Sequence, residues 1–567
     1  VLQHLPQLTS LDLSSNQISN IEVLQHLPQL TSLDLSSNQI SNIEVLQHLP
    51  QLTSLDLSSN QISNIEVLQP LIFRGIEVTT NDQRRRNLIS IGDNPLISPP
   101  LEIIKEGRQA IIDYFKALDQ DDSDYLYEAK LLIVGEGGAG KTSLRYKLKN
   151  RQAPLPKEEA TTKGIDIEQL TFEFDTDKEF TVNIWDFGGQ EIYYATHQFF
   201  LTKRSLYVLV DDTRNSDKDK SDSNFNYWLQ TVELYGDDSP LLIVQNEKGG
   251  RTKDIDLKSM KARYGFIKDQ YGTDLLTCTG LDQVEEAIRY HIRNLPHIGE
   301  RLPKSWLAVR KGLIETSRDT AYISLDKYFS VCKALGIAER SMALRISQYL
   351  HDLGTVLHFQ EDTLLKKTII LQNEWATDAV YKVLDDESIK ACRGEFSTSG
   401  AEQIWSESTY ADMHDELLAM MGKFELCYEL DHKPGNFLIP QLLPASTPEN
   451  YSWNNTDNLQ LRYQYEFMPK GLLSRLIVRL HRYVVDKEKA WKSGVVLERN
   501  GVQAEILERY GKDEIAIRTR GENCRELMII IAEDIDRLND SIEGVKVGKM
   551  VPCNCSTCKN FNKKRSI

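Results

Sequence analysis

A glycine-rich segment has the residue types and the spacing of a phosphate-binding loop. Residues 135–142 read Gly-Glu-Gly-Gly-Ala-Gly-Lys-Thr, which fits the pattern G-x-x-x-x-G-K-[ST]. Glycines let the backbone N–H groups turn toward a polyphosphate, and the helix N-terminus expected after the loop adds partial positive charge. Lys141 is expected to reach the β- and γ-phosphates, and the Thr142 hydroxyl is expected to bind Mg²⁺. The residues predicted to contact the nucleotide here are Gly135, Glu136, Gly137, Gly138, Ala139, Gly140, Lys141, Thr142 and Ser143.

A second segment carries residues suited to hydrolysis of the terminal phosphate. Residues 185–190 read Trp-Asp-Phe-Gly-Gly-Gln and fit the D-x-x-G-Q motif of GTP-hydrolysing switch proteins. Asp186 is placed to hold the Mg²⁺ shell, the Gly189 N–H to touch the γ-phosphate, and Gln190 to orient the attacking water. The alternative for Gln190 is a solvated loop amide with no catalytic role.

A threonine between these two motifs is a candidate sensor of the nucleotide state. Residues 160–166 read Ala-Thr-Thr-Lys-Gly-Ile-Asp. A threonine in this position can bind Mg²⁺ only when a γ-phosphate is present, so it reports which nucleotide is bound. Thr162 is favoured over Thr161, and a surface-loop threonine is the alternative. The predicted Mg²⁺ ligands are therefore Thr142, Thr162 and Asp186.

The segment expected to read the nucleotide base departs from the standard motif. Residues 244–250 read Val-Gln-Asn-Glu-Lys-Gly-Gly at the position of an N-K-x-D motif. Asn246 matches, the lysine is displaced to Lys248, and the aspartate that would read guanine is missing at Gly249. A preference for guanine therefore depends on the switch motifs, and an ATPase is kept as a third alternative. Residues 278–280, Cys-Thr-Gly, are a candidate for a second base-contacting loop.

An arginine is a candidate for neutralising charge during phosphoryl transfer, because a supplied arginine adds roughly 10³–10⁵ in rate. Arg214 follows an apolar run and precedes the polar segment 215–223, so it could reach the site of a partner subunit. A solvated loop arginine is the alternative for Arg214, and Arg204 is a second candidate. The predicted catalytic residues are Gln190 and Arg214.

The elements that must position these residues follow an alternating pattern. Within residues 126–297, the apolar run 131–134 precedes the glycine loop, and the helix-compatible run 143–148 follows it. The short continuous apolar runs 206–210 and 241–244 are typical of strands buried on both faces. The pattern predicts a Ras-like α/β domain with a mostly parallel sheet.

The N-terminal part of the chain is an internal repeat. The unit Val1–Glu22 recurs without change at 23–44 and 45–66, and it fits the leucine-rich-repeat pattern L-x-x-L-x-L-x-x-N-x-I. One such turn cannot bury its own apolar side, whereas stacked turns can, and Asn16 is placed to form a ladder along the stack. The pattern decays after Leu68. The missing initiator Met and the uncapped apolar end of the first repeat indicate a fragment that lacks upstream repeats.

The remaining segments have sequence patterns that differ from those of the repeats and of the α/β domain. A helix with apolar residues at helical spacing is expected in 101–125, followed by an acidic, solvated connector. Later, a helix ending at Gly354 precedes residues 356–359, which are expected to pair with residues 368–371. A helix followed by a hairpin is typical of a winged helix, and here a scaffold role is favoured over DNA binding. From about residue 460 onward a second α/β or α+β unit is expected.

Composition limits the classes of function. The net charge of −16 argues against a broad nucleic-acid surface, and no apolar run approaches the ~20 residues of a membrane helix. Eight cysteines in a long chain do not form the pattern of a disulfide framework, so a cytoplasmic protein is expected. Cys553, Cys555 and Cys558 have metal-like spacing, but structural zinc normally takes four ligands. A zinc site and free surface thiols both stay open.

The order of these parts resembles the Roco family, in which leucine-rich repeats precede a Ras-like Roc domain and a two-part COR module. Residues 196–202, Thr-His-Gln-Phe-Phe-Leu-Thr, are similar to Roc domains in particular. Residues 424–428, Phe-Glu-Leu-Cys-Tyr, and 467–472, Phe-Met-Pro-Lys-Gly-Leu, resemble the COR module. The resemblance spans essentially the whole chain and is to the prokaryotic type.

The resemblance implies a multidomain fold: a leucine-rich-repeat solenoid, a Ras-like P-loop GTPase domain, and an α+β COR module with a winged-helix-like first half. The expected domains are repeats with a C-terminal cap at 1–100, a linker helix at 101–125, Roc at 126–297, winged-helix-like COR-A at 298–450, and COR-B with a cysteine-containing tail at 451–567. The resemblance also gives the nucleotide-binding and hydrolytic roles described above to Lys141, Thr142, Thr162, Asp186, Gly189 and Gln190.

The expected function is a Mg²⁺-dependent GTPase switch that binds GDP and GTP, hydrolyses GTP and forms a homodimer through COR. The resemblance implies that the nucleotide state is coupled to the dimer arrangement. The repeats are expected to bind a protein ligand, with no nucleic-acid partner and no membrane span. The alternative is a nucleotide-sensing interaction scaffold in which hydrolysis is incidental.

Overall fold

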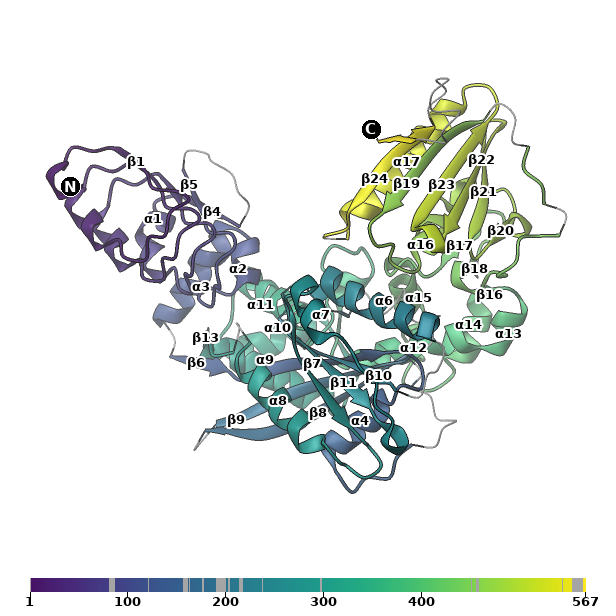
Figure 1. Ribbon diagram of the computed structural model, residues 1–567, viewed down its shortest axis with the longest axis horizontal. Coiled ribbons are helices and arrows are strands. Elements are labelled where there is room, and N and C mark those ends of the chain that lie inside the picture. Colours follow the sequence, from purple (N-terminus) through teal and green to yellow (C-terminus); the bar gives the residue numbers. More distant parts are fainter. Residues whose placement is uncertain are drawn as a thin grey trace. The chain divides into compact units, whose positions relative to one another are not determined.

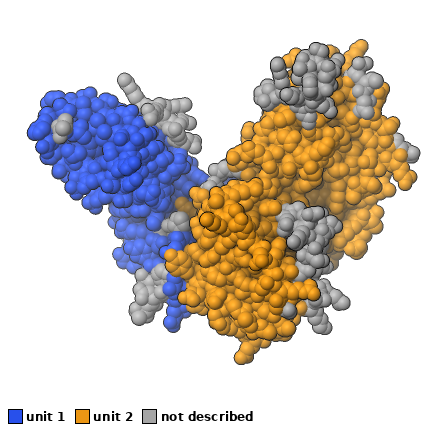
Figure 2. Space-filling model, in the orientation of Figure 1, with its two compact units in different colours: residues 1–129, 171–182, 292–373 blue, residues 130–170, 183–291, 374–567 orange. Residues whose placement is uncertain are grey.

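The protein divides into two compact units, each gathered from separate stretches of the chain (Figure 2). The first unit contains residues 1–129, 171–182 and 292–373, and the second contains residues 130–170, 183–291 and 374–567. The computed structural model describes residues 2–80, 87–120, 122–156, 162, 164–175, 178–189, 200–201, 204–213, 218–236, 238–295, 298–449, 451–454, 458–542, 544–552 and 564–566.

The repeats of the first unit form a solenoid with a parallel sheet (Figure 1). Strands β1 (Ser10–Asp12), β2 (Ser32–Asp34) and β3 (Ser54–Asp56) pair in identical register, each serine beside the next serine and each aspartate beside the next aspartate. The apolar core of the repeats is buried from Ile21 onward, because each turn covers the apolar side of its neighbour. In the first repeat, Leu8, Leu11, Leu13 and Ile18 are partly buried.

The solenoid continues beyond the repeats that are visible in the sequence. Strand β5 (Leu88–Ser90) pairs with β3, and β4 (Glu77–Thr79) pairs with the other edge of β5. Asn94 takes the place of the repeat asparagine, because its Nδ2 donates to Leu57 O at 2.9 Å and its Oδ1 accepts from Ile62 N at 3.0 Å. A further repeat turn therefore follows the three identical ones, separated from them by an insertion.

The predicted linker helix is two helices, α2 (Leu101–Lys105) and α3 (Arg108–Gln120), and Gly107 with φ +91° lies between them. The acidic segment predicted to be a solvated connector contains a strand. In this segment β6 (Ser123–Leu126) pairs antiparallel with β13 (Glu300–Pro303). The prediction missed this strand because its partner lies far away in the sequence.

The first part of the segment predicted to be winged-helix-like, residues 298–372, has three α-helices and a small sheet. Strands β14 (Tyr322–Ser324) and β15 (Thr368–Ile370) pair antiparallel. Leu357 and Ile370 exchange two backbone hydrogen bonds of 2.9 Å, so the predicted pairing of these two segments occurs. The helices are α9 (Lys304–Ser317), α10 (Leu325–Ala334) and α11 (Arg340–Asp352).

The central sheet has the strand order β12-β11-β10-β7-β9-β8. Strands β7, β10, β11 and β12 are mutually parallel, as predicted, and their apolar residues are buried on both faces. The strands are β7 (Glu128–Gly135), β8 (Ile165–Asp175), β9 (Lys178–Phe187), β10 (Leu206–Asp212), β11 (Leu241–Asn246) and β12 (Ile267–Thr273), and the helices are α4 (Lys141–Lys149), α6 (Lys218–Gly236), α7 (Leu257–Arg263) and α8 (Leu281–Arg293).

The rest of the second unit is α+β. Helices α12 (Asn373–Asp385), α13 (Glu387–Ala391), α14 (Thr398–Ile404) and α15 (His414–Lys423) accompany a small sheet of β16 (Glu395–Ser397), β18 (Asn436–Leu438) and β17 (Tyr428–Glu429). A seven-stranded antiparallel sheet follows, in the order β20-β21-β22-β23-β19-β24-β25. Its strands are β19 (Leu459–Tyr465), β20 (Ala490–Trp491), β21 (Gly494–Arg499), β22 (Val502–Arg509), β23 (Glu514–Arg520), β24 (Val547–Pro552) and β25 (Lys564–Ser566).

Helices α16 (Leu472–Arg479) and α17 (Cys524–Asp540) contribute their apolar residues to the core of this sheet. The result agrees with the α+β unit predicted from about residue 460. Within the described residues, every helix is too short or too polar to span a lipid bilayer.

Candidate nucleotide site

The glycine loop joins the end of β7 to the start of α4, as the motif requires. Gly135 has φ +140°, and a Cβ atom there would lie 2.4 Å from Val210 O. Gly140 has φ +106°, and a Cβ atom there would lie 2.3 Å from Asn246 Nδ2. Only glycine fits at these two positions, because the loop passes directly over β10 and beside β11.

Lys141 folds back across the loop. Its Nζ donates to Gly135 O at 2.9 Å and to Glu136 O at 2.8 Å, and the side chain is buried. Burial lowers the pKa of Lys141 to about 8, while the carboxylates of Asp186 and Glu136 act to raise it. The ammonium group therefore lies inside the loop, in reach of an anion held by the loop backbone.

Two hydroxyls and a carboxylate meet beside this lysine. Thr142 Oγ1 lies 2.6 Å from Thr162 Oγ1, and Thr162 Oγ1 donates to Asp186 Oδ2 at 3.3 Å. Asp186 is fully buried, and burial raises its pKa against the opposing effect of Lys141. Among the described residues, its Oδ1 has no hydrogen-bond partner. These oxygens are the ligands that Mg²⁺ prefers, so the three predicted residues fit that ion.

Sequence reasoning missed Arg145, which lies one turn after Lys141 on α4. Its Nε lies 3.5 Å from Asp186 Oδ2, and its Nη2 lies 2.8 Å from Asp166 Oδ2. The spacing along α4 was the available signal, since residues four apart share a helix face. Arg145 thus compensates the buried carboxylate and ties it to the start of β8.

The segment after β9 packs against the glycine loop. A Cβ atom on Gly189 would lie 2.4 Å from Gly137 N and 2.7 Å from Lys141 Nζ. The preceding residue, Gly188, donates its N–H to Gly164 O at 2.7 Å. The predicted γ-phosphate contact therefore lies against the loop, and its neighbour is bonded to the segment that carries Thr162.

Asn246 is buried and reaches the glycine loop rather than the surface. Its Nδ2 donates to Ala139 O at 2.8 Å, and among the described residues its Oδ1 has no hydrogen-bond partner. Lys248 begins a short 3-10 helix, Lys248–Gly250. The side chain of Glu247 lies against Gly272, where a Cβ atom would come 2.2 Å from its Oε1. Asn246 therefore supports the loop, and Gly249 stands where the standard motif has its aspartate.

Four family models match the chain. "Leucine Rich repeats" matches residues 6–48 and 28–70, and "Ras of Complex, Roc, domain of DAPkinase" matches residues 130–249. "C-terminal of Roc, COR-A domain" matches residues 303–443, and "C-terminal of Roc, COR-B domain" matches residues 456–567. The chain belongs to the Roco family. Its Roc domain is a Ras-like GTPase domain, and the nucleotide loop lies inside it.

Similar Roco proteins are longer than this chain. "Probable serine/threonine-protein kinase pats1" of Dictyostelium discoideum is 28% identical over 508 residues, which is 81% of this chain and 16% of that protein. The "Roc-COR-CHAT protease" of Runella zeae is 29% identical over 453 residues, covering 75% of this chain and 47% of that protein. This chain therefore spans less than half the length of these relatives. A solved structure of Methanosarcina barkeri Roco2, bound to GDP, is 33% identical and covers 57% of this chain and 98% of that chain, with a TM-score of 0.48.

Several predicted site residues of this Roco chain lie outside the described residues: Gln190, Arg214, Cys553, Cys555 and Cys558. Their predicted roles stay predictions. Glu136, which is described, accepts a hydrogen bond from Asn224 Nδ2 of α6 at 2.7 Å, a contact that the sequence did not suggest.

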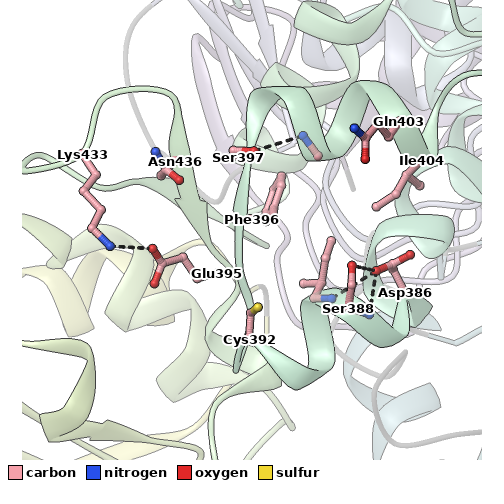
Figure 3. A pocket seen from close by; sticks show the side chains of 12 residues that line it. Asp386, Ser388, Cys392, Glu395, Phe396, Ser397, Gln403, Ile404, Lys433 and Asn436 are labelled. Carbon is pink, nitrogen blue, oxygen red and sulfur yellow. Dashed lines mark hydrogen bonds and ion pairs between the residues drawn. The ribbon is translucent and has the colours of Figure 1, made fainter.

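COR-A also contains a pocket of about 700 Å³, lined by none of the nucleotide-loop residues (Figure 3). Its lining combines apolar side chains such as Phe396 and Ile404 with an ion pair between Lys433 Nζ and Glu395 Oε1 at 2.9 Å. Asp386 faces it while accepting the N–H groups of Ser388 and Ile389 at the start of α13. These polar groups have partners within the fold, so the pocket carries no assignment.

Proposed function

We propose that this chain is a Mg²⁺-dependent molecular switch that binds GDP and GTP and hydrolyses GTP in its Roc domain. The observation that carries the proposal is the cluster of Thr142, Thr162 and Asp186 beside the buried ammonium of Lys141. Mg²⁺ held there would neutralise charge on the phosphates, while the loop backbone and Lys141 bind and orient them. Thr162 would bind the ion only when a γ-phosphate is present. Asn246 supports the loop through its hydrogen bond to Ala139 O.

The proposal extends to the whole chain. The COR module joins two copies into a homodimer whose arrangement follows the nucleotide state, and the repeats bind a protein ligand in the cytoplasm. The domain boundaries predicted from the sequence are part of this proposal. The alternative, a nucleotide-sensing scaffold with incidental hydrolysis, would show nucleotide binding with little turnover.

A nucleotide-affinity panel tests the binding step. Titration calorimetry of the full chain with GDP, GTP, ADP and ATP in magnesium buffer is expected to show binding of the guanine nucleotides. Lys141→Ala is expected to lose this binding, because it removes the ammonium that faces the phosphates. Lys258→Ala, an exposed lysine on α7, is the matched control and keeps it. Normal GTP affinity in the Lys141 variant would contradict the assignment.

A substitution of Gln190 tests the hydrolysis step. We expect Gln190→Leu to bind GTP normally and to hydrolyse it at least roughly tenfold more slowly, because the attacking water loses its orienting amide. Single-turnover release of phosphate measures this rate separately from binding. Equal rates in the variant and the wild type would remove Gln190 from the mechanism and leave the binding assignment intact.

A further inference from the structure

We propose that helix α12 of COR-A is a clamp on the Roc segment that carries Thr162, and that Tyr381 and Glu374 are its positioning residues. The switch I segment is defined here as Thr162 and residues 164–167. The inference rests on the proposed nucleotide function and deepens it, because it assigns control of nucleotide release to two side chains outside the Roc domain.

The first contact is steric. Gly164 has φ +78°, and a Cβ atom built on it would lie 2.0 Å from Cδ2 and 2.4 Å from Cε2 of Tyr381. Both residues are buried. The tyrosine ring therefore lies directly against the main chain of Gly164, two positions after Thr162, and leaves no space for the segment to move toward α12.

The second contact is a hydrogen bond about two turns earlier on the same helix. Ile167 N donates to Glu374 Oε1 at 2.5 Å. Ile167 lies in β8, the edge strand of the Roc sheet, where outward N–H groups have no strand to bond. Glu374 supplies the acceptor that a neighbouring strand would otherwise supply. The helix thus holds the switch I segment at two points, Gly164 by packing and Ile167 by a hydrogen bond.

The clamped segment connects directly to the nucleotide site. Gly164 O accepts the N–H of Gly188, which precedes the glycine packed on the phosphate loop. Thr162 meets Thr142 and Asp186 in the proposed Mg²⁺ cluster. If α12 releases Gly164 and Ile167, the contacts that place Thr162 in this cluster lose their external support.

The electrostatics of the contact argue for a positioning role rather than for stability alone. Asp378 lies between Glu374 and Tyr381 on α12, and burial together with the charges of Glu374 and Asp166 raises its pKa to about 6. Burial also raises the pKa of Glu374, the hydrogen bond from Ile167 lowers it, and the charge of Asp166 raises it. Arg145, paired with Asp166, lowers the pKa of Glu374. Carboxylates placed against each other oppose the docking of α12, and such local conflicts are typical of functional positions.

Release of a fluorescent GDP and of a fluorescent non-hydrolysable GTP analogue from the full chain tests the clamp. Tyr381→Ala and Glu374→Ala are expected to release both nucleotides about tenfold faster, since a packing contact or a charged hydrogen bond is lost. The acceleration is expected to be larger for the GTP analogue, because only the γ-phosphate state uses Thr162. A general loss of stability would not favour one nucleotide in this way.

Matched variants separate the hydrogen bond from charge and from folding. Glu374→Gln keeps an acceptor for Ile167 N and is expected to release nucleotide within about twofold of the wild-type rate. Glu387→Ala removes an exposed carboxylate of the neighbouring helix α13 and serves as the control. Thermal melting of each variant checks that it folds. The comparison of Glu374→Ala with Glu374→Gln keeps the test decisive even if Tyr381→Ala does not fold.

A double-mutant cycle tests the steric contact. Gly164→Ala is strained in any background because of its positive φ, but its added Cβ meets a ring only when Tyr381 is present. The release rate is therefore expected to rise more for Gly164→Ala alone than for Gly164→Ala added to Tyr381→Ala. Wild-type release rates in all folded variants, or equal effects of Glu374→Ala and Glu374→Gln, would overturn the clamp. Absence of any nucleotide binding by the wild type would instead overturn the proposed function.

Discussion

The buried carboxylate of Asp186 has a cost in stability and a use in binding a cation. Its carboxylate is fully buried, burial raises its pKa, and its Oδ1 has no hydrogen-bond partner among the described residues. A buried carboxylate of this kind destabilises a fold unless charge or hydrogen bonds compensate it. Arg145 and Lys141 supply part of that compensation, and a divalent cation would supply more while keeping the group ionised. The residue is best explained by the ion it would hold.

His351 allows a prediction on pH. His358 N donates to His351 Nδ1 at 3.2 Å, and burial, with a smaller effect of His358, lowers the pKa of His351 to about 4 from an ordinary 6.5. The unfolded chain then binds a proton near pH 6.5, whereas the folded chain does not until about pH 4. This contribution to stability is complete above pH 6.5 and is lost as the pH falls toward 4, with a limiting slope of about 1.4 kcal/mol per pH unit.

Hydrogen-exchange protection of α11 between pH 8 and pH 5, corrected for the intrinsic pH dependence of exchange, measures this effect. The wild type is expected to lose stability below about pH 6.5, and His351→Asn, which keeps an acceptor but cannot titrate, is expected to lose less. His26→Asn, at an exposed repeat position, is the control and should follow the wild type. Parallel profiles for the wild type and the His351 variant would contradict the assignment.

At the scale of the element, the repeat solenoid depends on its asparagine ladder. Asn60 Nδ2 donates to Leu35 O at 2.9 Å and Leu57 O at 3.1 Å, and its Oδ1 accepts from Ile40 N at 3.0 Å. Asn60→Ala removes these hydrogen bonds and takes the acceptor from the buried N–H of Ile40, while Leu35 O and Leu57 O keep the amides of Asn38 and Asn94. It is expected to destabilise the repeats by about 2 kcal/mol. Asn16→Ala, at an exposed position of the first repeat, is the matched control and is expected to cost under about 0.5 kcal/mol.

Hydrogen exchange is the appropriate measurement, because a chain of several domains does not unfold in one step. The backbone amides of Ile40 and of its neighbours in the second and third repeats are expected to exchange faster in Asn60→Ala than in Asn16→Ala. Equal protection in the two variants would show that packing alone holds the solenoid.

The elements that the sequence predicts well are those with local signals. The phosphate loop is contiguous, and the repeats are identical, so both are visible without a structure. The turn at Asn94 was missed because the insertion before it breaks the period, although Asp93 has φ 53°, close to the φ 55° of Ser59 in the repeat. Contacts such as Tyr381 on Gly164 join residues far apart in the chain, and no local pattern encodes them.

At the scale of the molecule, the repeats and the first part of COR-A share one core. The segment predicted as a linker places Tyr114 against Trp306, with ring centroids 5.9 Å apart, and Tyr114 donates its hydroxyl proton to Arg301 O. Arg345 of α11 forms an ion pair with Asp113 of α3. The helix after the repeats is therefore a packed part of the first unit, so a ligand on the repeats would act on a body that includes part of COR-A.

The oligomeric state of the whole chain is expected to depend on the bound nucleotide. If the COR-mediated dimer follows the nucleotide, the two nucleotide forms must differ in their free energy of association, since a ligand shifts only an equilibrium whose states it binds unequally. Sedimentation of the full chain with GDP and with a non-hydrolysable GTP analogue, in magnesium buffer over a range of concentrations, is expected to give different dissociation constants. Lys141→Ala, which is expected to lose nucleotide binding, should give one constant under both conditions. The same constant for the wild type in both forms would show that the switch acts without changing the assembly, and the clamp of α12 on the switch I segment would then act within a single chain.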